Sequence, residues 1–233
     1  MKYIIANWKA NHNIVSAQNW FDQFSQAVRQ GRVLNTDDLV VILALPYHLL
    51  VPGAVFAEKL NSRYIHLAVQ NLSQTEAGAF TGEIAAENLK HLPVAVALLG
   101  HSERRRLYKE TNQDVAQKAV QASLQGIQPV VCVDESIYQQ QAQQFNQQDL
   151  NQLIVAYEPP SAISTSGGQI PDAAQVGQVI QQIKQTYQGS PVLYGGSVKA
   201  ANVRDFLAVA DGVLVGGASL EAEKFIRLLQ QAG

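Results

Sequence analysis

The sequence contains a single cysteine, Cys132, among its 233 residues. One thiol cannot form an internal disulfide, so the chain is not a small secreted scaffold held together by disulfides. We interpret Cys132 as a buried, unreactive thiol, and we expect the protein in the cytoplasm, where thiols stay reduced.

Charge and long apolar runs are also scarce. Only 15% of the residues are charged, the formal net charge is −2, and no block of like charges is long enough for a tail. We therefore expect neither nucleic acid nor a membrane as a partner. No apolar run reaches the roughly 18 residues of a membrane span, and polar residues interrupt the first nine positions too early for a signal peptide. Small molecules are the expected partners.

Hydrophobic residues make up 47% of the chain, enough to fill a sizeable core, and they recur in short stretches. The stretch at residues 94–99 is apolar throughout rather than alternating, as expected of a parallel strand buried on both faces. Eight strands are expected, at residues 3–6, 39–45, 65–69, 94–99, 128–133, 153–157, 191–194 and 213–215.

Segments with helical patterns follow the expected strands. The aromatic residues Trp20, Phe21 and Phe24 recur at helical spacing within residues 16–29, and Thr111 with Asp114 forms a capping pair for a helix that runs to Gln125. Further helical segments are expected up to residue 60, around 85–92, in the glutamine-rich stretch 139–148 as a solvated face, at 172–189, and after residues 199 and 219.

This eightfold alternation predicts an α/β fold, a compact closed (β/α)₈ barrel formed by one domain over residues 1–233. An open, doubly wound sheet is the alternative. No Gly-x-Gly-x-x-Gly follows the first strand, which argues against a dinucleotide-binding fold.

Polar side chains stand directly after several strands, where a barrel brings them to one mouth. Asn7 and Lys9 follow the first strand, and their spacing points both side chains the same way if the chain stays extended. His101 follows the fourth strand and Glu158 the sixth. The prolines at 159 and 160 prevent a helix from beginning at once after Glu158.

Two glycine-rich turns, at residues 194–197 and 215–219, follow the last two strands. Glycines allow close backbone approach to an anion, and barrels often hold phosphate at these loops. The five histidines lie at no metal-ligand spacing, so we expect no metal. A phosphate anchor beside a carboxylate, a lysine and a histidine predicts proton abstraction next to a carbonyl, in an aldose–ketose isomerisation of a small phosphosugar without a cofactor.

Six motifs resemble those of triosephosphate isomerases, in the family's order, at residues 7–9, 78–83, 100–105, 156–159, 194–198 and 212–220. The resemblance implies a TIM barrel that interconverts glyceraldehyde 3-phosphate and dihydroxyacetone phosphate in glycolysis and gluconeogenesis. It implies that Glu158 is the base and that His101 shuttles protons between the two oxygens. Lys9 is then the cationic electrophile, and Asn7 orients the substrate.

The resemblance also implies supporting groups. Glu103 supports Lys9, and Ser102 holds Glu158 when the site is empty. The residues implied to bind phosphate are Ser164, Ser197, Gly216 and Gly217.

A homodimer is implied as well. The loop at residues 70–82 resembles the family's dimer loop, which places Thr81 near Asn7 and Lys9 of the partner subunit. Glu83 and Arg104 match an ion pair between subunits.

Some residues depart from the family pattern. Asp134 stands where glycine is usual, and Ser161, Ser164 and Ser166 replace a tryptophan and two glycines of a common lid sequence. A second hypothesis follows, in which the barrel binds phosphorylated ligands but has lost efficient catalysis. The presence of all four catalytic residues favours an active isomerase, because phosphate binding alone would not require them.

Overall fold

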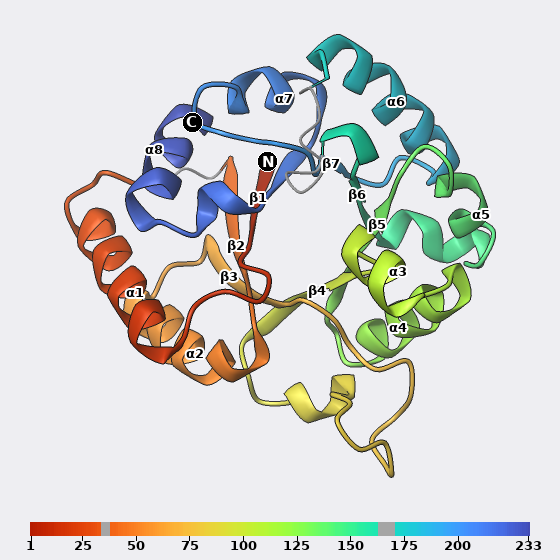
Figure 1. Ribbon diagram of the computed structural model, residues 1–233, viewed down its shortest axis with the longest axis horizontal. Helices are drawn as coiled ribbons and strands as arrows, with labels where there is room; N and C mark the ends of the chain where they lie inside the picture. Colours follow the sequence, from red (N-terminus) through yellow and green to blue (C-terminus); the bar gives the residue numbers. More distant parts are fainter. Residues whose placement is uncertain (34–37, 163–170) are drawn as a thin grey trace.

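Eight parallel strands form a closed barrel, and helices form a ring outside it (Figure 1). The structure is a computed structural model that describes residues 1–33, 38–162 and 171–233. The strands are β1 (Lys2–Asn7), β2 (Leu39–Leu45), β3 (Ile65–Val69), β4 (Val94–Leu99), β5 (Gln128–Val133), β6 (Ile154–Tyr157), β7 (Val192–Tyr194) and β8 (Gly212–Val215).

Each strand pairs with the next one along the chain, and β1 pairs with β8 to close the barrel. Along this closing seam Tyr3 lies opposite Gly212, and Ala6 lies opposite Val215. All eight predicted strands are present within one or two residues of their expected bounds. The prediction of a (β/α)₈ barrel is therefore confirmed, and the open sheet is excluded.

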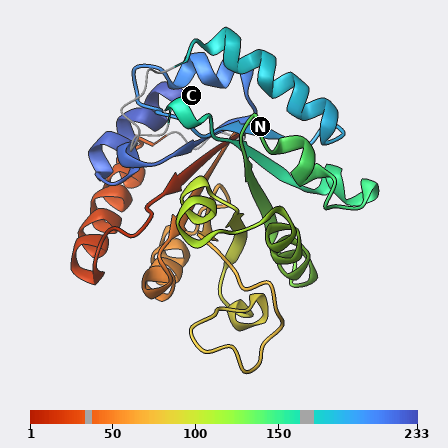
Figure 2. The same cartoon turned by 45° about the vertical axis from the view of Figure 1, so that its right-hand side comes forward.

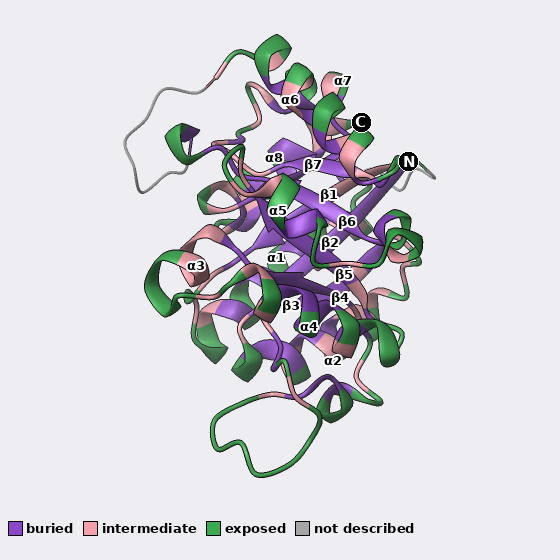
Figure 3. Ribbon diagram, turned by 90° about the vertical axis from the view of Figure 1, so that its right-hand side faces the viewer, coloured by how far each residue is buried: buried purple, intermediate pink, exposed green. Residues whose placement is uncertain are grey.

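Two apolar layers explain why the strands are apolar throughout. Side chains such as Ile5, Ile42 and Leu98 fill the barrel interior, and Cys132 belongs to this inner layer with 1% of its surface exposed. The alternate residues pack outward against the helices, so each strand is covered on both sides. Figure 3 shows buried strands at the centre and exposed residues on the outer helices.

The α-helices agree with the predicted segments, with three differences, one of which is that the helix expected in the stretch 139–148 ends at Ala142. The helices are α1 (Ile14–Arg29), α2 (Leu50–Leu60), α3 (Ser102–Tyr108), α4 (Asn112–Leu124), α5 (Tyr138–Ala142), α6 (Ala173–Thr186), α7 (Val203–Val209) and α8 (Ala222–Ala232). Helix α3 was not predicted. Between β3 and β4 the described chain forms only a short 3₁₀ helix, η2 (Ala86–Leu89), within the expected segment 85–92.

Four further 3₁₀ helices complete the described elements: η1 (Tyr47–Leu49), η3 (Gln147–Gln152), η4 (Pro160–Ala162) and η6 (Gly217–Ser219). Among the helices of the described ranges, none combines the length and the apolar character that a membrane span requires.

The interpretation of the glutamine-rich stretch as a solvated face is wrong at one position. Gln139 and Gln140 are exposed, but Gln141 is fully buried on α5. Its side chain accepts a hydrogen bond from Arg105 and donates one to the carbonyl of Asn112. A buried amide is tolerated when both of its ends are hydrogen-bonded.

Helix α4 begins with the predicted capping pair, which forms a full capping box. The Thr111 hydroxyl accepts a hydrogen bond from the Asp114 backbone N–H at 3.1 Å, and the Asp114 carboxylate accepts one from the Thr111 N–H at 2.8 Å. These bonds from Thr111 lower the pKa of Asp114.

Thr111→Ala is expected to lower the free energy of unfolding by about 1 kcal/mol, because it leaves a helix-terminal N–H without its side-chain acceptor. For a chain of this length the melting temperature should fall by about 2–4 °C. Thermal denaturation followed by circular dichroism tests this. Thr111→Ser, which keeps the hydroxyl, should restore most of the stability, and a Thr111→Ala protein as stable as wild type would contradict the capping role.

Candidate active site

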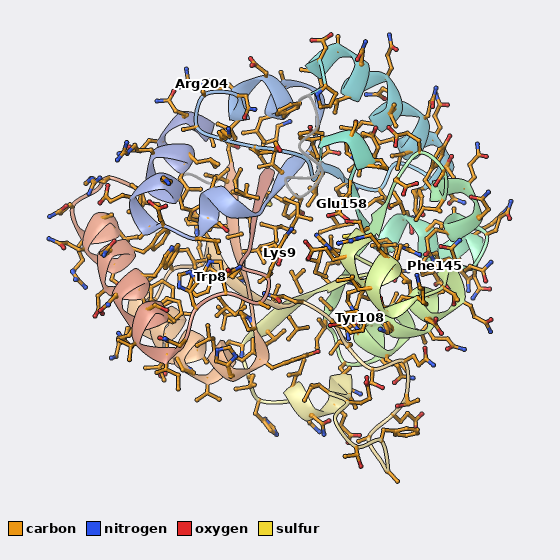
Figure 4. The ribbon with its side chains drawn as sticks, in the orientation of Figure 1. Trp8, Lys9, Tyr108, Phe145, Glu158 and Arg204 are labelled. Carbon is orange, nitrogen blue, oxygen red and sulfur yellow. The ribbon has the colours of Figure 1, made fainter. Side chains whose placement is uncertain are left out.

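The predicted catalytic residues lie at the carboxyl ends of the strands. Asn7 is the last residue of β1, Glu158 follows β6, and His101 caps the N-terminus of α3 directly after β4. Figure 4 shows Lys9 and Glu158 nearer the middle of the ring than Arg204, which lies on its outer side. The barrel thus brings together side chains from three strand ends.

The backbone turns at Lys9 instead of staying extended. Lys9 has a φ of +52°, in the left-handed region, so the expectation of an extended Asn7–Lys9 segment is wrong. The Asn7 side-chain oxygen accepts the Lys9 backbone N–H at 3.0 Å, which closes the turn. Trp8 anchors it from the other side, because its ring is fully buried and stacks on Phe21.

Gln70 also holds this turn, and the sequence analysis did not single it out. Its side-chain amide donates to the Lys9 carbonyl at 3.0 Å and to the Ala44 carbonyl at 2.9 Å. Such bonds offset the cost of a left-handed backbone at a residue other than glycine. Gln70 directly follows β3, so the rule that drew attention to polar residues after other strands would have found it.

The Lys9 ammonium is aimed by Glu103. Lys9 Nζ lies 2.7 Å from Glu103 Oε1, and both side chains are only partly exposed. Glu103 is in the first turn of α3, directly after Ser102. The helix that follows β4 therefore orients a cation on the turn that follows β1.

His101 and Glu158 form the most deeply buried ion pair of the site. His101 Nε2 lies 2.8 Å from Glu158 Oε1, and the two side chains are 8% and 4% exposed. The Ser102 backbone N–H donates to the other carboxylate oxygen at 3.0 Å. At the far side of the ring, His101 Nδ1 accepts the Glu103 backbone N–H at 3.2 Å. Nδ1 is therefore the unprotonated nitrogen, and Nε2 carries the proton toward Glu158.

The two buried groups shift each other's ionisation. Burial by itself raises the pKa of Glu158, but the neighbouring His101, the Ser102 N–H and Lys9 lower it below its ordinary value. Burial by itself lowers the pKa of His101, and the Glu158 carboxylate raises it above its ordinary value. Glu158 is thus held as a carboxylate, the form that accepts a proton.

His101→Gln is expected to raise the pKa of Glu158, because it removes the main group that opposes burial. Only the ionised carboxylate accepts a proton, so with Glu158 as the predicted base the acidic limb of kcat/KM should move to higher pH. A ¹³C NMR titration of labelled glutamate carboxyls, assigned with Glu158→Gln, measures the pKa directly. An unchanged pKa in the His101→Gln protein would mean that His101 does not control the ionisation of Glu158.

The glycine-rich turns lie beside these groups. A Cβ on Gly195 would be 2.9 Å from Glu158 Cγ, and one on Gly216 would be 3.6 Å from Lys9 Cε. The Ser197 hydroxyl donates to the Ala162 carbonyl at 2.8 Å, which connects the turn after β7 with the segment after Glu158. Gly217 begins η6, and Ser164 lies outside the described residues.

Asp134, the departure from the family pattern after β5, has a local structural role. Its carboxylate accepts the backbone N–H of Ser136 at 2.7 Å and the Ser136 hydroxyl at 2.6 Å. This arrangement stabilises the turn that leads into α5.

A cavity of about 1020 Å³ lies at the opposite, amino-terminal ends of the strands. Tyr3, His66 and Gln128 are among the residues that line it, and none of the predicted site residues does. That end of a barrel contributes to stability, whereas chemistry takes place at the carboxyl ends.

The predicted subunit-contact residues lie away from the barrel centre. Thr81 and Glu83 are exposed on the segment after β3, which extends beyond the ring of helices in Figures 1 and 2. Arg104 bonds within its own chain to Glu110, which also pairs with Lys118.

A (β/α)₈ barrel with a carboxylate, an imidazole and an ammonium at one mouth defines an enzyme that moves protons next to a carbonyl group. The family model described as triosephosphate isomerase matches residues 2–232. The chain belongs to the triosephosphate isomerase family, as its motifs predicted, and it is an isomerase.

Similar proteins named triosephosphate isomerase occur in several bacteria. The protein from Mesomycoplasma hyorhinis is 42% identical, over 97% of this chain and 96% of its own length. Those from Synechococcus sp. (strain JA-2-3B'a(2-13)) and Chlamydia muridarum are 36% and 34% identical, over 97% and 98% of this chain and 95% and 90% of their own lengths. The similarity thus extends over nearly the whole of both chains.

Proposed function

We propose that this chain, as one barrel domain over residues 1–233, interconverts glyceraldehyde 3-phosphate and dihydroxyacetone phosphate through an enediolate. The observation that carries the proposal is the contact between His101 and Glu158 at the mouth that Lys9 also faces. Glu158 is the base, His101 and Lys9 stabilise the developing oxyanion, and Asn7 orients the substrate.

The reaction begins when Glu158 turns from the Ser102 N–H toward the substrate. Its carboxylate takes a proton from the carbon next to the carbonyl, and the electron pair of that C–H bond forms the enediolate double bond. Charge then develops on the carbonyl oxygen, where the Nε2–H of His101 and the Lys9 ammonium stabilise it. His101 gives its Nε2 proton to the former carbonyl oxygen and takes the proton of the neighbouring hydroxyl, which becomes the new carbonyl. Glu158 returns its proton to the former carbonyl carbon, so the isomerisation is complete with no net gain or loss of atoms.

Movement of Glu158 also prepares His101. The carboxylate raises the pKa of the imidazole in the empty site, and this effect weakens when Glu158 turns away. Burial and the Glu103 N–H at Nδ1 then keep the ring neutral, with its proton on Nε2. Triosephosphate isomerases are themselves an established example of a glutamate base working with a neutral histidine, and this chain's contacts fit that arrangement.

The phosphate group is held by the turns after β7 and β8. Ser197, Gly216 and Gly217 supply these turns, and Ser164 contributes from the segment after Glu158. Gly195 in the turn after β7 lies beside Glu158 and Gly216 in the turn after β8 lies beside Lys9, and this supports the assignment, because both turns then face the proposed reacting groups. Backbone N–H groups of glycine turns are suited to such an anion.

The working assembly is a homodimer in the cytoplasm. The segment after β3 is exposed, and Phe80 in it leaves 48% of its surface uncovered. Ile14 and Val15, close to the Lys9 turn, are 61% and 70% exposed. Apolar surface at both places supports docking of the loop onto the partner beside the partner's Lys9, with Thr81, Glu83 and Arg104 in the contact. The buried thiol of Cys132 fits a reducing compartment.

The test is conversion of glyceraldehyde 3-phosphate to dihydroxyacetone phosphate by the purified protein, without added metal or nucleotide. We expect turnover that depends on Glu158, with Glu158→Gln as the control for contaminating enzyme. Binding of a phosphorylated triose without turnover would contradict the proposal and favour the phosphate-binding barrel with impaired catalysis.

A further inference from the structure

Arg105 lies on α3, one helical turn beyond His101, and its guanidinium contacts the end of β4, β5, the start of α4 and α5. Its Nε donates to the Gly100 carbonyl at 2.8 Å. Nη1 donates to the Asn112 side-chain oxygen at 2.8 Å, and Nη2 donates to the Gln141 side-chain oxygen at 2.7 Å and to the Cys132 carbonyl at 3.3 Å. All three nitrogens of the guanidinium are thus engaged.

These four acceptors are two backbone carbonyls and two side-chain amides, so each is uncharged. Burial lowers the pKa of Arg105. The fully buried Gln141 also donates to the Asn112 carbonyl at 3.0 Å, which fixes its oxygen toward the arginine. The rigid planar fork of arginine can satisfy acceptors in such different directions, whereas a lysine ammonium cannot. These contacts fix the orientation of the guanidinium, but none of the four acceptors neutralises its charge.

Both backbone carbonyls belong to segments that position His101 or Glu158. The Gly100 carbonyl belongs to the peptide bond that ends at the nitrogen of His101, so its orientation helps to set where the imidazole begins. On β5, the residue after Cys132 is Val133, whose carbonyl accepts the Glu158 backbone N–H at 2.8 Å. Arg105 therefore connects the strand end that carries His101 with the strand end that holds Glu158.

Packing at Gly100 makes this connection tight. Gly100 has a φ of +67°, and a Cβ there would lie 2.9 Å from Arg105 Nη2 and 2.7 Å from Val115. The guanidinium thus sits directly against the turn before His101. Any shift of the guanidinium will move that turn, because close-packed interiors transmit displacements.

We propose that Arg105 is a positioning residue for the isomerisation, oriented by Gln141 and Asn112, and that it sets the placement of His101 Nε2 relative to Glu158. This rests on the proposed roles of His101 and Glu158. Arg105 acts through the backbone of β4 and β5 and does not touch the reacting atoms.

Arg105→Lys tests the proposal, with Arg106→Lys as the matched control, because Arg106 is the exposed neighbour on the same helix. A small displacement of a reacting group costs up to about 100-fold, so we expect kcat to fall by about 10- to 100-fold. KM should stay within about threefold, since the phosphate turns lie on β7 and β8. Arg106→Lys should match wild type.

A second pair of variants changes only the orienting amide. Gln141→Glu keeps an oxygen acceptor for Arg105 but loses the donor to the Asn112 carbonyl, so its kcat should fall less than that of a variant without any acceptor. Gln141→Leu has a similar volume without the acceptor, and its kcat should fall toward that of Arg105→Lys. Equal kcat in the two Gln141 variants would overturn the orienting role of Gln141.

The readout that separates positioning from stability is the ¹⁵N NMR signal of the His101 ring, together with the pH profile of kcat. Both should change in Arg105→Lys and not in Arg106→Lys. A loss of kcat with unchanged His101 signals and pH profile would assign Arg105 to stability alone and overturn the proposal. Absence of isomerase activity in wild type would refute the proposed function instead, and the His101 signals would still report on Arg105.

Discussion

Glu158→Asp is expected to lower kcat by about 100-fold or more while the protein stays folded. The shorter side chain withdraws the carboxylate by about 1 Å, and proton transfer to a carbon-bound hydrogen depends steeply on such a distance. In the wild type the Glu158 carboxylate is held between His101 Nε2 at 2.8 Å and the Ser102 N–H at 3.0 Å. The aspartate cannot keep both contacts and also reach the substrate carbon.

The loss should appear in kcat more than in KM, because phosphate binding does not involve this carboxylate. Glu58→Asp is the matched control, since Glu58 is exposed on α2 and far along the chain from the site residues. Its kcat should equal that of wild type. A Glu158→Asp enzyme within threefold of wild type would remove Glu158 from the role of base.

The parts of the fold that depend on local pattern were predictable. Strands apolar throughout, such as Val94–Leu99, indicate burial on both faces, and repetition of that pattern indicates a closed parallel barrel. The capping box at Thr111 is likewise local, because both partners lie within one helical turn. The positions of Glu158 and His101 follow from the same rule, since Glu158 directly follows β6 and His101 is separated from the end of β4 by Gly100 alone.

The features that were missed depend on contacts between distant segments. The left-handed backbone of Lys9 is stabilised in part by Gln70, 61 residues away, which donates to its carbonyl. Gln141 looks like its exposed neighbours in sequence, but Arg105, 36 residues away, requires its oxygen inside the protein. Helix α3 is short, with seven residues, and its polar composition hides any apolar stripe. Its first turn is nevertheless what aims the backbone N–H groups at Glu158 and His101.

Thr81→Arg is expected to produce monomers that are less stable than wild type. Their kcat/KM should be reduced by about 100-fold or more. The physical reason lies in the Lys9 turn, which has a φ of +52° and depends on surrounding contacts to persist. Within the chain Gln70 and Trp8 hold it, and in the proposed dimer the loop of the partner covers its remaining side. An arginine at position 81 introduces a bulky charge at that contact and prevents the loop from docking.

Sedimentation velocity, thermal denaturation and kcat/KM measured on the same preparation test this, because assembly and catalysis should be lost together. Deletion of residues 73–77 should give the same result by shortening the loop. Gln139→Arg adds the same charge to an exposed position on α5 and should remain dimeric and fully active. A monomeric wild type with full activity would separate assembly from catalysis. The Lys9 turn would then be held by Asn7, Gln70 and Trp8 of its own chain, without any contribution from a second subunit.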